Sequence, residues 1–336
     1  MRRPLLGPDE LLGYLIQHGV LSPVALDDPT LRLSEVPGRN LNARVTGGGR
    51  SLFVKQLRDH DLADGVTREV AWATAASCAP PLVAADPEHG IVVTELFQGS
   101  SLGDLVRRSN VATPSEHLRD AADALAALPG PDDPDAAAPR HRGLEWSAML
   151  RSSPGSALRE LSPATLEALL LVRGDRRLLA AVGEVAETTG ERFCHGDARF
   201  DNVFLRDDGT VGLVDGEASG RGPESWDLAC LLGDALAHWL RSVPPAASGS
   251  FDPSTARIPF PDVQEGLRSA VAATAARRGQ DVDPVTLAAL IGLRLVQTTL
   301  EQTRGHTTMP PSSYALLQFA ANVLHTPDRA ARVLSG

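Results

Sequence analysis

The spacing of hydrophobic residues changes several times along the chain. Residues 9–18 carry apolar side chains at helical spacing between a proline and a glycine, which predicts a short amphipathic helix. Over 31–57 the pattern changes to short β-like runs separated by the turn sequences PGRN and GGGR, which predicts three antiparallel strands. Helical spacing returns over 62–77, residues 90–97 indicate another strand, and the chain from 115 onward is mostly helical.

These patterns predict an α+β fold with two lobes. We expect an N-terminal helical extension over 1–28 and a small N-lobe over 29–98, built on an antiparallel sheet. A large helical C-lobe would follow over 99–336, interrupted by one β hairpin region at 192–217. With 43% hydrophobic residues among 336, the chain has enough apolar material to bury a core in both lobes.

Charge and cysteine content narrow the choice of partners. The formal net charge is −10, whereas proteins that bind nucleic acids carry basic stripes, so we expect no nucleic-acid partner. The three cysteines form no CxxC pair, which indicates neither a zinc site nor a redox motif and fits a reducing compartment. No run approaches the roughly 20 apolar residues of a membrane span, so we expect a cytoplasmic protein without a membrane partner.

Lysine is almost absent from the chain. Of the 32 basic residues, 31 are arginine, and only Lys55 on the third predicted strand is lysine. Either one lysine codon survived by chance in an arginine-rich sequence, or this position needs a compact ammonium group that a planar guanidinium cannot replace. The surroundings of Lys55 decide between these two interpretations.

The segment 192–217 brings oxygen-bearing side chains together. Asp208 and Gly209 between two apolar runs predict a two-residue β-hairpin turn. Counting back from that turn, Asn202 faces Asp215, and directly opposed residues have Cβ atoms about 4.5–5.5 Å apart. An amide oxygen and a carboxylate at such a distance suit Mg²⁺, which takes few protein ligands and completes its shell with water and phosphate oxygens.

Other charged residues flank this pair. Asp197 lies in the loop that leads into the hairpin, where a carboxylate could accept the proton of an acceptor hydroxyl. Glu217 lies two residues beyond Asp215 and is either a second metal ligand or a solvent-exposed acid. Arg199 either stabilises a transferring phosphate or is an ordinary surface arginine.

The order of these residues resembles that of a known family. The run HGDARFDN (195–202), followed by LVDGE (213–217), is similar to the catalytic loop and metal motif of the aminoglycoside phosphotransferase and choline kinase superfamily. The resemblance implies a bilobal protein-kinase-like fold, with ATP or GTP and Mg²⁺ as cofactors. It further implies that Asp197 is the catalytic base and that Asn202 and Asp215 bind the metal ion.

The same resemblance assigns roles upstream of the hairpin. Lys55 would hold the α- and β-phosphates, and Glu69 on the following helix would orient it. The backbone from Glu95 to Phe97, in the sequence VVTELFQG, would pair with the nucleotide base. These assignments extend the resemblance over roughly residues 30–240.

Supporting residues and two departures complete the comparison with the family pattern. His195 would anchor the catalytic loop, and Asp227 in ESWDLA would tie that loop down from the next helix. The phosphate-binding loop EVPGRNLNA holds one glycine, Gly38, in place of a glycine-rich sequence. The metal motif is Asp-Gly-Glu, with Gly216 where many relatives have an aromatic residue.

Together these features predict transfer of a γ-phosphate to an acceptor hydroxyl. The sequences PDELLGYLIQHGVL (8–21) and GLRLVQTTLEQT (292–303) are also similar to kinases of lanthipeptide-type peptide natural-product biosynthesis. That similarity implies phosphorylation of Ser or Thr in a precursor peptide, followed by phosphate elimination on a partner lyase.

Three alternatives remain beside the peptide kinase. An aminoglycoside or another small-molecule antibiotic is the alternative acceptor, although residues 251–336 hold seven acids against eight arginines and so show no strongly acidic site for a polycation. A pseudokinase scaffold that binds a partner enzyme and an unrelated metal-dependent hydrolase are the alternatives from other classes.

Overall fold

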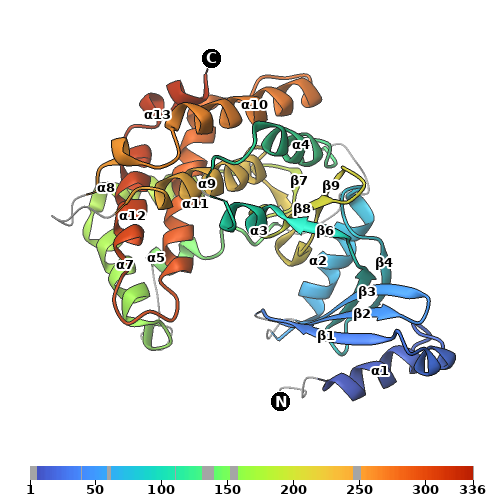
Figure 1. Ribbon diagram of the computed structural model, residues 1–336. Helices are drawn as coiled ribbons and strands as arrows, with labels where there is room; N and C mark the ends of the chain where they lie inside the picture. Colours follow the sequence, from blue (N-terminus) through green and yellow to red (C-terminus); the bar gives the residue numbers. More distant parts are fainter. Residues whose placement is uncertain are drawn as a thin grey trace.

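The two predicted lobes are present in the computed structural model (Figure 1). The structure describes residues 6–38, 40–58, 62–109, 111–130, 140–151, 158–244 and 251–335. A lobe built on a β-sheet lies at one end, and helices make up most of the rest, so the predicted bilobal α+β fold is confirmed.

Alternating side chains build the N-lobe sheet. Its antiparallel strands have the order β1-β2-β3-β5-β4, and from β1 to β5 they span Arg32–Val36, Leu41–Gly47, Arg50–Gln56, Leu82–Asp86 and Ile91–Glu95. On β3, Leu52 and Val54 belong to the core that Leu11 and Leu15 of the N-terminal helix α1 (Pro8–Gln17) also enter. Lys55 follows Val54 and points to the opposite face of the sheet, because side chains alternate along a strand.

Four of these strands were predicted and one was not: the segment 90–97 forms the expected strand as β5. The antiparallel strands expected over 31–57, with Lys55 on the third, are confirmed. β4 was missed; it is a half-exposed strand at the end of the sheet, and its residues lack a strict alternation of apolar and polar side chains.

Helix α2 (Leu62–Ala75) joins the two lobes. Val66 packs with Val92 of β5 and Leu57 in a small core behind the sheet. Six residues further on, Trp72 belongs to the large core of the C-lobe and is 1% exposed. The helix therefore cannot move with one lobe without disturbing the packing of the other.

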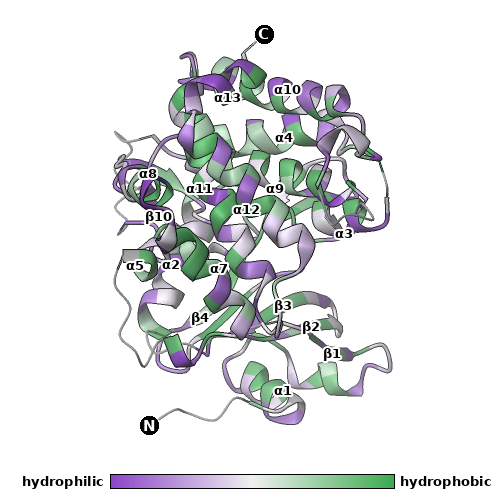
Figure 2. Ribbon diagram, turned by 90° about the vertical axis from the view of Figure 1, so that its left-hand side faces the viewer, coloured by the Kyte–Doolittle hydropathy of each residue, from purple (hydrophilic) through white to green (hydrophobic). Residues whose placement is uncertain are grey.

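The C-lobe packs around helices α9 (Trp226–Arg241) and α11 (Pro284–Gln302). These two contact each other and lie in the middle of the lobe in Figure 2. Nearly every residue of α9 is buried, including Trp226, which makes it a rigid support. The other described α-helices of this lobe are α3 (Leu102–Arg107), α4 (Ser115–Ala126), α5 (Ser147–Arg151), α7 (Pro163–Gly174), α8 (Arg176–Ala186), α10 (Phe260–Arg278), α12 (Pro311–His325) and α13 (Pro327–Leu334).

The hairpin in the β region ends in a three-residue turn and not in the predicted two-residue turn. β8 (Val203–Arg206) pairs antiparallel with β9 (Val211–Leu213), and the Arg206 amide donates to the Thr210 carbonyl oxygen at 2.9 Å. Gly209 takes a left-handed φ of 81°, as is common in three-residue hairpin loops. The remaining strands are β6 (Gly99–Ser101), which pairs with β8, and β7 (Arg192–Cys194), which pairs with β10 (Gly220–Gly222).

The register of the hairpin shifts by one residue as a result. The prediction that Asn202 faces Asp215 is wrong, because Asn202 lies opposite Val214, whose amide donates to the Asn202 carbonyl oxygen at 3.0 Å. Asp215 lies one residue beyond the paired region and reaches the site by a different backbone conformation.

The remaining predictions about the whole chain concern membrane helices, domain boundaries and location. No helix in the described part of the chain is both long enough and apolar enough to cross a membrane. The boundaries at residues 28/29 and 98/99, and the cytoplasmic location, stay predictions.

Buried His141 makes stability depend on pH. Burial and the nearby charge of Arg68 lower the pKa of His141 from 6.5 to about 4. Between pH 6.5 and pH 4, His141 therefore binds a proton in the unfolded chain but not in the folded chain. The free energy of unfolding falls as the pH decreases through this range. Between pH 7 and pH 5 we expect this residue to remove about 2 kcal/mol from the free energy of unfolding.

Urea unfolding at several pH values would measure this effect. His141→Asn should flatten the decrease between pH 7 and pH 5, whereas the same change at exposed His306 should leave it unaltered. An identical pH dependence in wild type and His141→Asn would contradict the assignment.

Candidate active site

One ammonium group gathers three carboxylates between the lobes. Nζ of Lys55 lies 2.6 Å from Oε1 of Glu69 on α2 and 2.9 Å from Oε2 of Glu217, and it also binds the Asp215 carboxylate. Asp215 directly precedes the short helix η3 (Gly216–Ala218), which carries Glu217. This environment favours the second interpretation of the lone lysine, since a single thin stem must deliver one compact charge into a buried space.

The charges in this cluster stabilise one another. Burial acts to lower the pKa of Lys55, but the carboxylates of Asp215, Glu69 and Glu217 outweigh it and hold that pKa well above its ordinary value. Burial acts to raise the pKa of Asp215, and Lys55 outweighs it, so the Asp215 pKa is lowered. Burial raises the pKa of Glu69. Lys55 is therefore charged at neutral pH.

Glu69 is held in position by the C-lobe. Its Oε2 accepts the Gly216 amide at 3.0 Å while Oε1 accepts Lys55. The residue before Glu69 is Arg68, whose buried guanidinium donates to the carbonyl oxygens of Ser219 and Arg140, each at 2.7 Å. The ion pair between Lys55 and Glu69 is thus fixed to both lobes.

Asp215 has an unusual backbone. Its φ of 72° and ψ of 59° are left-handed, and among the described residues it is the one non-glycine residue with positive φ. Such conformations cost energy and persist where the surrounding structure enforces them, often at functional sites. Here the conformation turns the carboxylate back toward Lys55 directly after β9.

Gly216, the departure from the family pattern, is compensated by α2. A Cβ at Gly216 would lie 2.4 Å from Cβ of Trp72, so the indole occupies the space beside this glycine. The Trp72 ring stacks on Phe193 with centroids 6.2 Å apart and meets His195 edge-on at 4.6 Å. An aromatic side chain therefore lies beside the metal motif, but it comes from α2.

The loop carrying Asp197 is fastened to the start of α9. The Asp227 carboxylate accepts the amides of His195 at 2.6 Å and Gly196 at 2.9 Å. Nε1 of Trp226 donates to the Gly196 carbonyl oxygen at 2.9 Å. The structure thus places Asp227 where the sequence analysis expected a residue that ties down this loop.

His195 has no free ring nitrogen. It is fully buried, Nε2 lies 2.9 Å from the Val214 carbonyl oxygen, and Nδ1 accepts the Asp197 amide at 3.3 Å. A carbonyl can only accept, so Nε2 is the donor and Nδ1 the acceptor of this ring. This arrangement fits an anchoring residue rather than a base.

Asp197 and Asn202 face each other across the loop. Nδ2 of Asn202 donates to the Asp197 carbonyl oxygen at 2.9 Å and lies 3.4 Å from Asp197 Oδ2. Burial raises the pKa of Asp197, and the guanidinium groups of Arg199 and Arg294 oppose that rise. Arg199 is not an ordinary surface residue, since its Nε lies 3.3 Å from Asp197 Oδ2.

Sequence reasoning missed the residues of α11 that surround Asp197. Arg294 is 1% exposed, with Nη1 3.6 Å from Asp197 Oδ1 and 3.4 Å from Oε1 of Glu301. The available signal was one arginine inside the apolar run IGLRLV on a helix too hydrophobic to lie at the surface. A buried arginine needs carboxylate partners, and one of them is Asp197.

The shortened phosphate loop contacts the metal motif. Nδ2 of Asn40, next to the β1–β2 turn, donates to Glu217 Oε2 at 2.9 Å. Glu217 is therefore neither isolated nor fully exposed. A Cβ at Gly38 would lie 2.6 Å from Nδ2 of Asn42, so this glycine lets the loop pass close to β2.

The predicted base-binding segment has one unused amide. The Glu95 amide donates to the Pro81 carbonyl oxygen and the Leu96 amide to that of Ser51, each at 2.9 Å. Within the described part of the chain, no hydrogen bond is recorded for the Phe97 amide. Phe97 also packs its ring where a Cβ of Gly212 would lie, which brings the segment against the catalytic hairpin.

The donor set around Lys55 fits a hard divalent cation. Ligand oxygens of Glu69, Asp215 and Glu217 lie within 4.8 Å of one another. Asn202 donates its amide nitrogen to Asp197, which leaves its amide oxygen as the atom available to a cation. Carboxylate and amide oxygens are the ligands that Mg²⁺ prefers.

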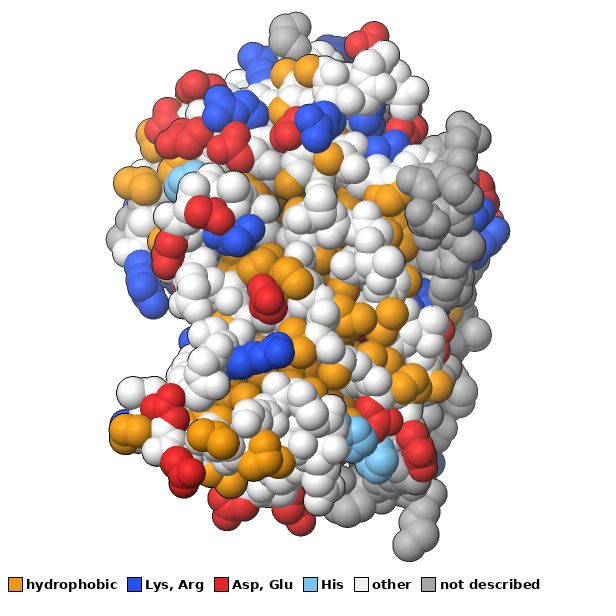
Figure 3. All heavy atoms as spheres, turned by 90° about the vertical axis from the view of Figure 1, so that its right-hand side faces the viewer, with side chains coloured by type: hydrophobic (Ala, Val, Ile, Leu, Met, Phe, Trp, Pro, Cys, Tyr) orange, Lys and Arg blue, Asp and Glu red, His pale blue; other side chains and the backbone are white. Residues whose placement is uncertain are grey.

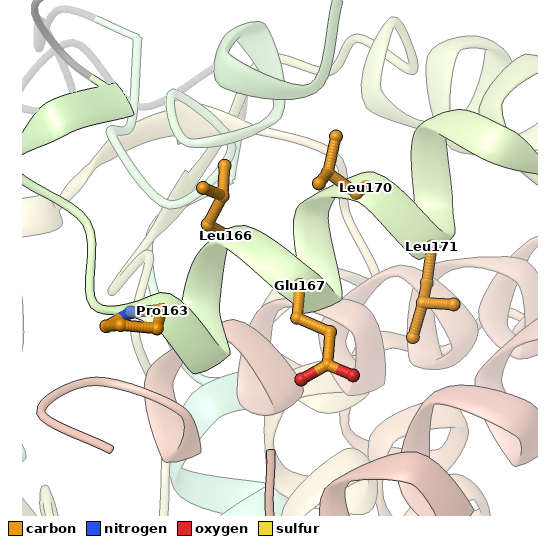
Figure 4. Close-up of a pocket in the computed structure, with 5 residues that line it drawn as sticks. All are labelled: Pro163, Leu166, Glu167, Leu170 and Leu171. Carbon is orange, nitrogen blue, oxygen red and sulfur yellow. The ribbon is translucent and has the colours of Figure 1, made fainter. Parts of the chain in front are cut away.

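Two features of the molecular surface stand out. Figure 3 shows the face on which the lobes meet, with hydrophobic side chains in a band between the upper and lower parts of the molecule. A shallow pocket of about 360 Å³ lies on α7, and Figure 4 shows its lining by Pro163, Leu166, Glu167, Leu170 and Leu171. That pocket contains none of the predicted site residues.

Comparison with known proteins identifies the family. The profile of the phosphotransferase enzyme family matches residues 33–265, which is well over half of the chain. The chain belongs to this family. The phosphotransferase thus has the enzyme class that the HGD and Asp-Gly-Glu motifs predicted. A comparison with curated protein sequences gave no significant match.

Solved structures of kinases share the fold of the phosphotransferase. A choline/ethanolamine kinase family protein from Mesorhizobium loti aligns with a TM-score of 0.56 and 15% identity over 98% of this chain and 99% of its own. An ethanolamine kinase from Plasmodium vivax aligns with a TM-score of 0.60 and 11% identity, over 97% and 92%. A microcompartment-associated aminopropanol kinase aligns with a TM-score of 0.53 and 17% identity, over 96% and 98%. The predicted kinase-like fold is confirmed, and identities this low carry no information about the acceptor.

The contact between Gly216 and Trp72 generates a stability prediction. Gly216→Ala forces the added methyl group against the indole and should lower the free energy of unfolding by about 1–3 kcal/mol, as overpacking does in other cores. The measurement is urea unfolding. Gly183→Ala on α8 is the matched control, because a Cβ there meets nothing within 4 Å and alanine favours a helix. Equal stability of Gly216→Ala and wild type would rule out the contact.

Proposed function

We propose that this phosphotransferase moves the γ-phosphate of ATP or GTP to an acceptor hydroxyl. The observation that carries the proposal is the buried Lys55 ammonium, paired with Glu69 and Asp215 beside the loop of Asp197 and Asn202. Phosphoryl transfer needs little covalent chemistry from a protein; it needs positioned charge and an oriented acceptor. The Lys55 cluster supports the first requirement, and the loop of Asp197 and Asn202 supports the second.

The N-lobe residues would bind the nucleotide. Lys55 would hold the α- and β-phosphates with the ammonium group that now contacts the carboxylates. Glu69 would keep the lysine stem in place, since its second oxygen is bonded to the backbone at Gly216. The Phe97 amide is the candidate partner for the base, and the loop around Gly38 would lie over the phosphates.

The C-lobe residues would act on the acceptor. Asp197 would orient the hydroxyl and take its proton, and its raised pKa makes it a stronger proton acceptor than an ordinary aspartate. Asn202 would fix Asp197 through its amide nitrogen. His195 and Asp227 would keep the loop in place, and Arg199 would face the transferring phosphate.

Mg²⁺ would be held by Asn202 and Asp215, with Glu217 as an adjacent acid. When bound, such an ion neutralises charge on the β- and γ-phosphate oxygens. In the structure Asp215 is paired with Lys55, so nucleotide and cation would share the two groups that now bind each other.

For the acceptor we infer Ser or Thr of a precursor peptide in lanthipeptide-type biosynthesis, with a partner lyase that eliminates the phosphate. Support comes from the resemblance of segments 8–21 and 292–303 and from the charge around Asp197. The neighbouring acids Asp234 and Glu301 both lie in ion-pair contact with the buried Arg294 guanidinium, so neither is a free acid for a polycation. This disfavours an aminoglycoside, the alternative acceptor.

Binding of nucleotide tests the first part of the proposal. We expect calorimetry to show Mg²⁺-dependent binding of ATP or GTP to wild type and a loss of tenfold or more, roughly 1.4 kcal/mol, in Asp215→Asn. Asp208→Asn is the matched control, because Asp208 lies in the turn of the same hairpin, where it accepts bonds from Thr210 and pairs with Arg206. Equal loss in both variants would contradict a role for Asp215 at the site.

Phosphorylation of defined acceptors tests the second part. The enzyme, Mg²⁺ and ATP would be incubated separately with three acceptors: a precursor peptide rich in Ser and Thr, an amino alcohol and an aminoglycoside. Mass spectrometry would identify the phosphorylated products. We expect a phosphopeptide that disappears when the partner lyase is added. Phosphorylation of the aminoglycoside alone would overturn the peptide assignment, and nucleotide binding without any transfer would favour the pseudokinase scaffold.

A further inference from the structure

Arg294 is a charged residue buried in the middle of the C-lobe, among the apolar side chains of its core. It lies in the apolar run IGLRLV (291–296) of α11 and is 1% exposed. Gly233 on α9 makes room for it, because a Cβ there would lie 2.8 Å from Cγ of Arg294. A full positive charge thus occupies the contact between the two central helices of the lobe.

Three carboxylates from different elements surround this guanidinium. Nη1 lies 3.4 Å from Glu301 Oε1 on the same helix and 3.6 Å from Asp197 Oδ1 in the catalytic loop. Nη2 lies 3.5 Å from Asp234 Oδ1 on α9. The other oxygen of Asp234 accepts the Phe200 amide at 2.9 Å, which fastens the same loop by its backbone. Arg294 is therefore the common partner of the loop, α9 and α11.

This arrangement is a poor way to stabilise a fold. Desolvating a charge network of this kind costs about as much as the attraction returns, and an apolar cluster would do as well. Within the described residues, Nε of Arg294 and Oδ1 of Asp197 have no hydrogen-bond partner. The guanidinium is placed for its effect on the carboxylates rather than for its own hydrogen bonds.

We propose that Arg294 is the positioning residue of the reaction, holding the Asp197 carboxylate toward the acceptor by anchoring it to α9 and α11. The inference rests on the proposed phosphoryl transfer and adds a residue that lies outside the HGD and Asp-Gly-Glu motifs. Arg294 is too deeply buried to touch phosphate itself, unlike Arg199, whose side chain is 34% exposed. It acts only through Asp197 and its neighbours.

Steady-state kinetics with MgATP, and with water or the peptide as phosphoryl acceptor, test this role. Arg294→Met should lower kcat on the order of 10²-fold, the effect of misplacing a catalytic group by about 1 Å. The KM for ATP should stay within about twofold, because the Lys55 cluster is not part of this network. Arg294→Lys keeps the charge but not the planar set of donors. Its kcat should therefore lie between those of wild type and Arg294→Met.

A second variant separates positioning from folding. Gly233→Ala leaves Arg294 in the chain but pushes against its Cγ. Alanine is the better helix former, but overpacking a buried contact lowers stability, so kcat is measured well below the Tm of the variant, where it should fall while the KM for ATP does not. Arg268→Met is the matched control: Arg268 bonds to the Val333 carbonyl oxygen between α10 and α13, and its loss should leave kcat unchanged.

The outcomes distinguish this inference from the proposed function. Loss of kcat in Arg294→Met and Gly233→Ala, measured at a temperature where both variants are folded and with the KM for ATP retained, supports the positioning role. Full turnover in both variants overturns it and leaves the phosphotransfer intact. A parallel loss of ATP binding shows a structural role and also overturns it. A wild type that binds ATP but transfers phosphate to neither acceptor overturns both proposals.

Discussion

The ammonium group of Lys55 is the point on which the site is built. It is one positive charge in a buried space that holds carboxylates from α2, from the end of β9 and from η3. Without it, three negative charges would face one another within a few ångströms, and burial would force at least one to take a proton. The left-handed backbone of Asp215 and the fixed position of Glu69 both make sense as responses to this charge.

The two lobes are joined by packing as well as by charge. Trp72 enters the core of the C-lobe from α2 and fills the space beside Gly216, while Arg68 bonds to carbonyl oxygens of the C-lobe. In this chain the aromatic group beside the metal motif moves with the helix that carries Glu69. The ion pair and the metal motif are therefore mechanically one unit, which argues for an assembled catalytic site rather than a relaxed scaffold.

Local sequence signals predicted much of this arrangement. Alternation placed Lys55 on the third strand, and the order of the HGD and Asp-Gly-Glu motifs brought Asp197 and Asp215 to one loop and one strand end. The hairpin register was wrong because an Asp-Gly pair fits both a two-residue turn and the three-residue turn that the structure adopts. One residue of difference moved Asn202 from Asp215 to Val214.

What the sequence could not show depends on long-range contacts. Trp72 and Gly216 compensate for each other although far apart in the chain, and no local pattern links them. Arg294 looks like an isolated polar residue in an apolar helix until the fold brings Asp197 to it. Single-residue exceptions to a helix pattern are weak signals by themselves, and here they mark the residues around the catalytic loop.

Because Lys55 is the only lysine in the chain, its role can be tested by chemistry directed at a single side chain. An acyl phosphate derivative of ATP transfers its acyl group to a lysine that lies beside the bound phosphates. The account predicts acylation at Lys55, detected by peptide mass spectrometry and prevented by excess ATP with Mg²⁺. Acylation only at the terminal amine, or labelling of Lys55 that ATP does not reduce, would contradict the claim that this ammonium group binds the phosphates.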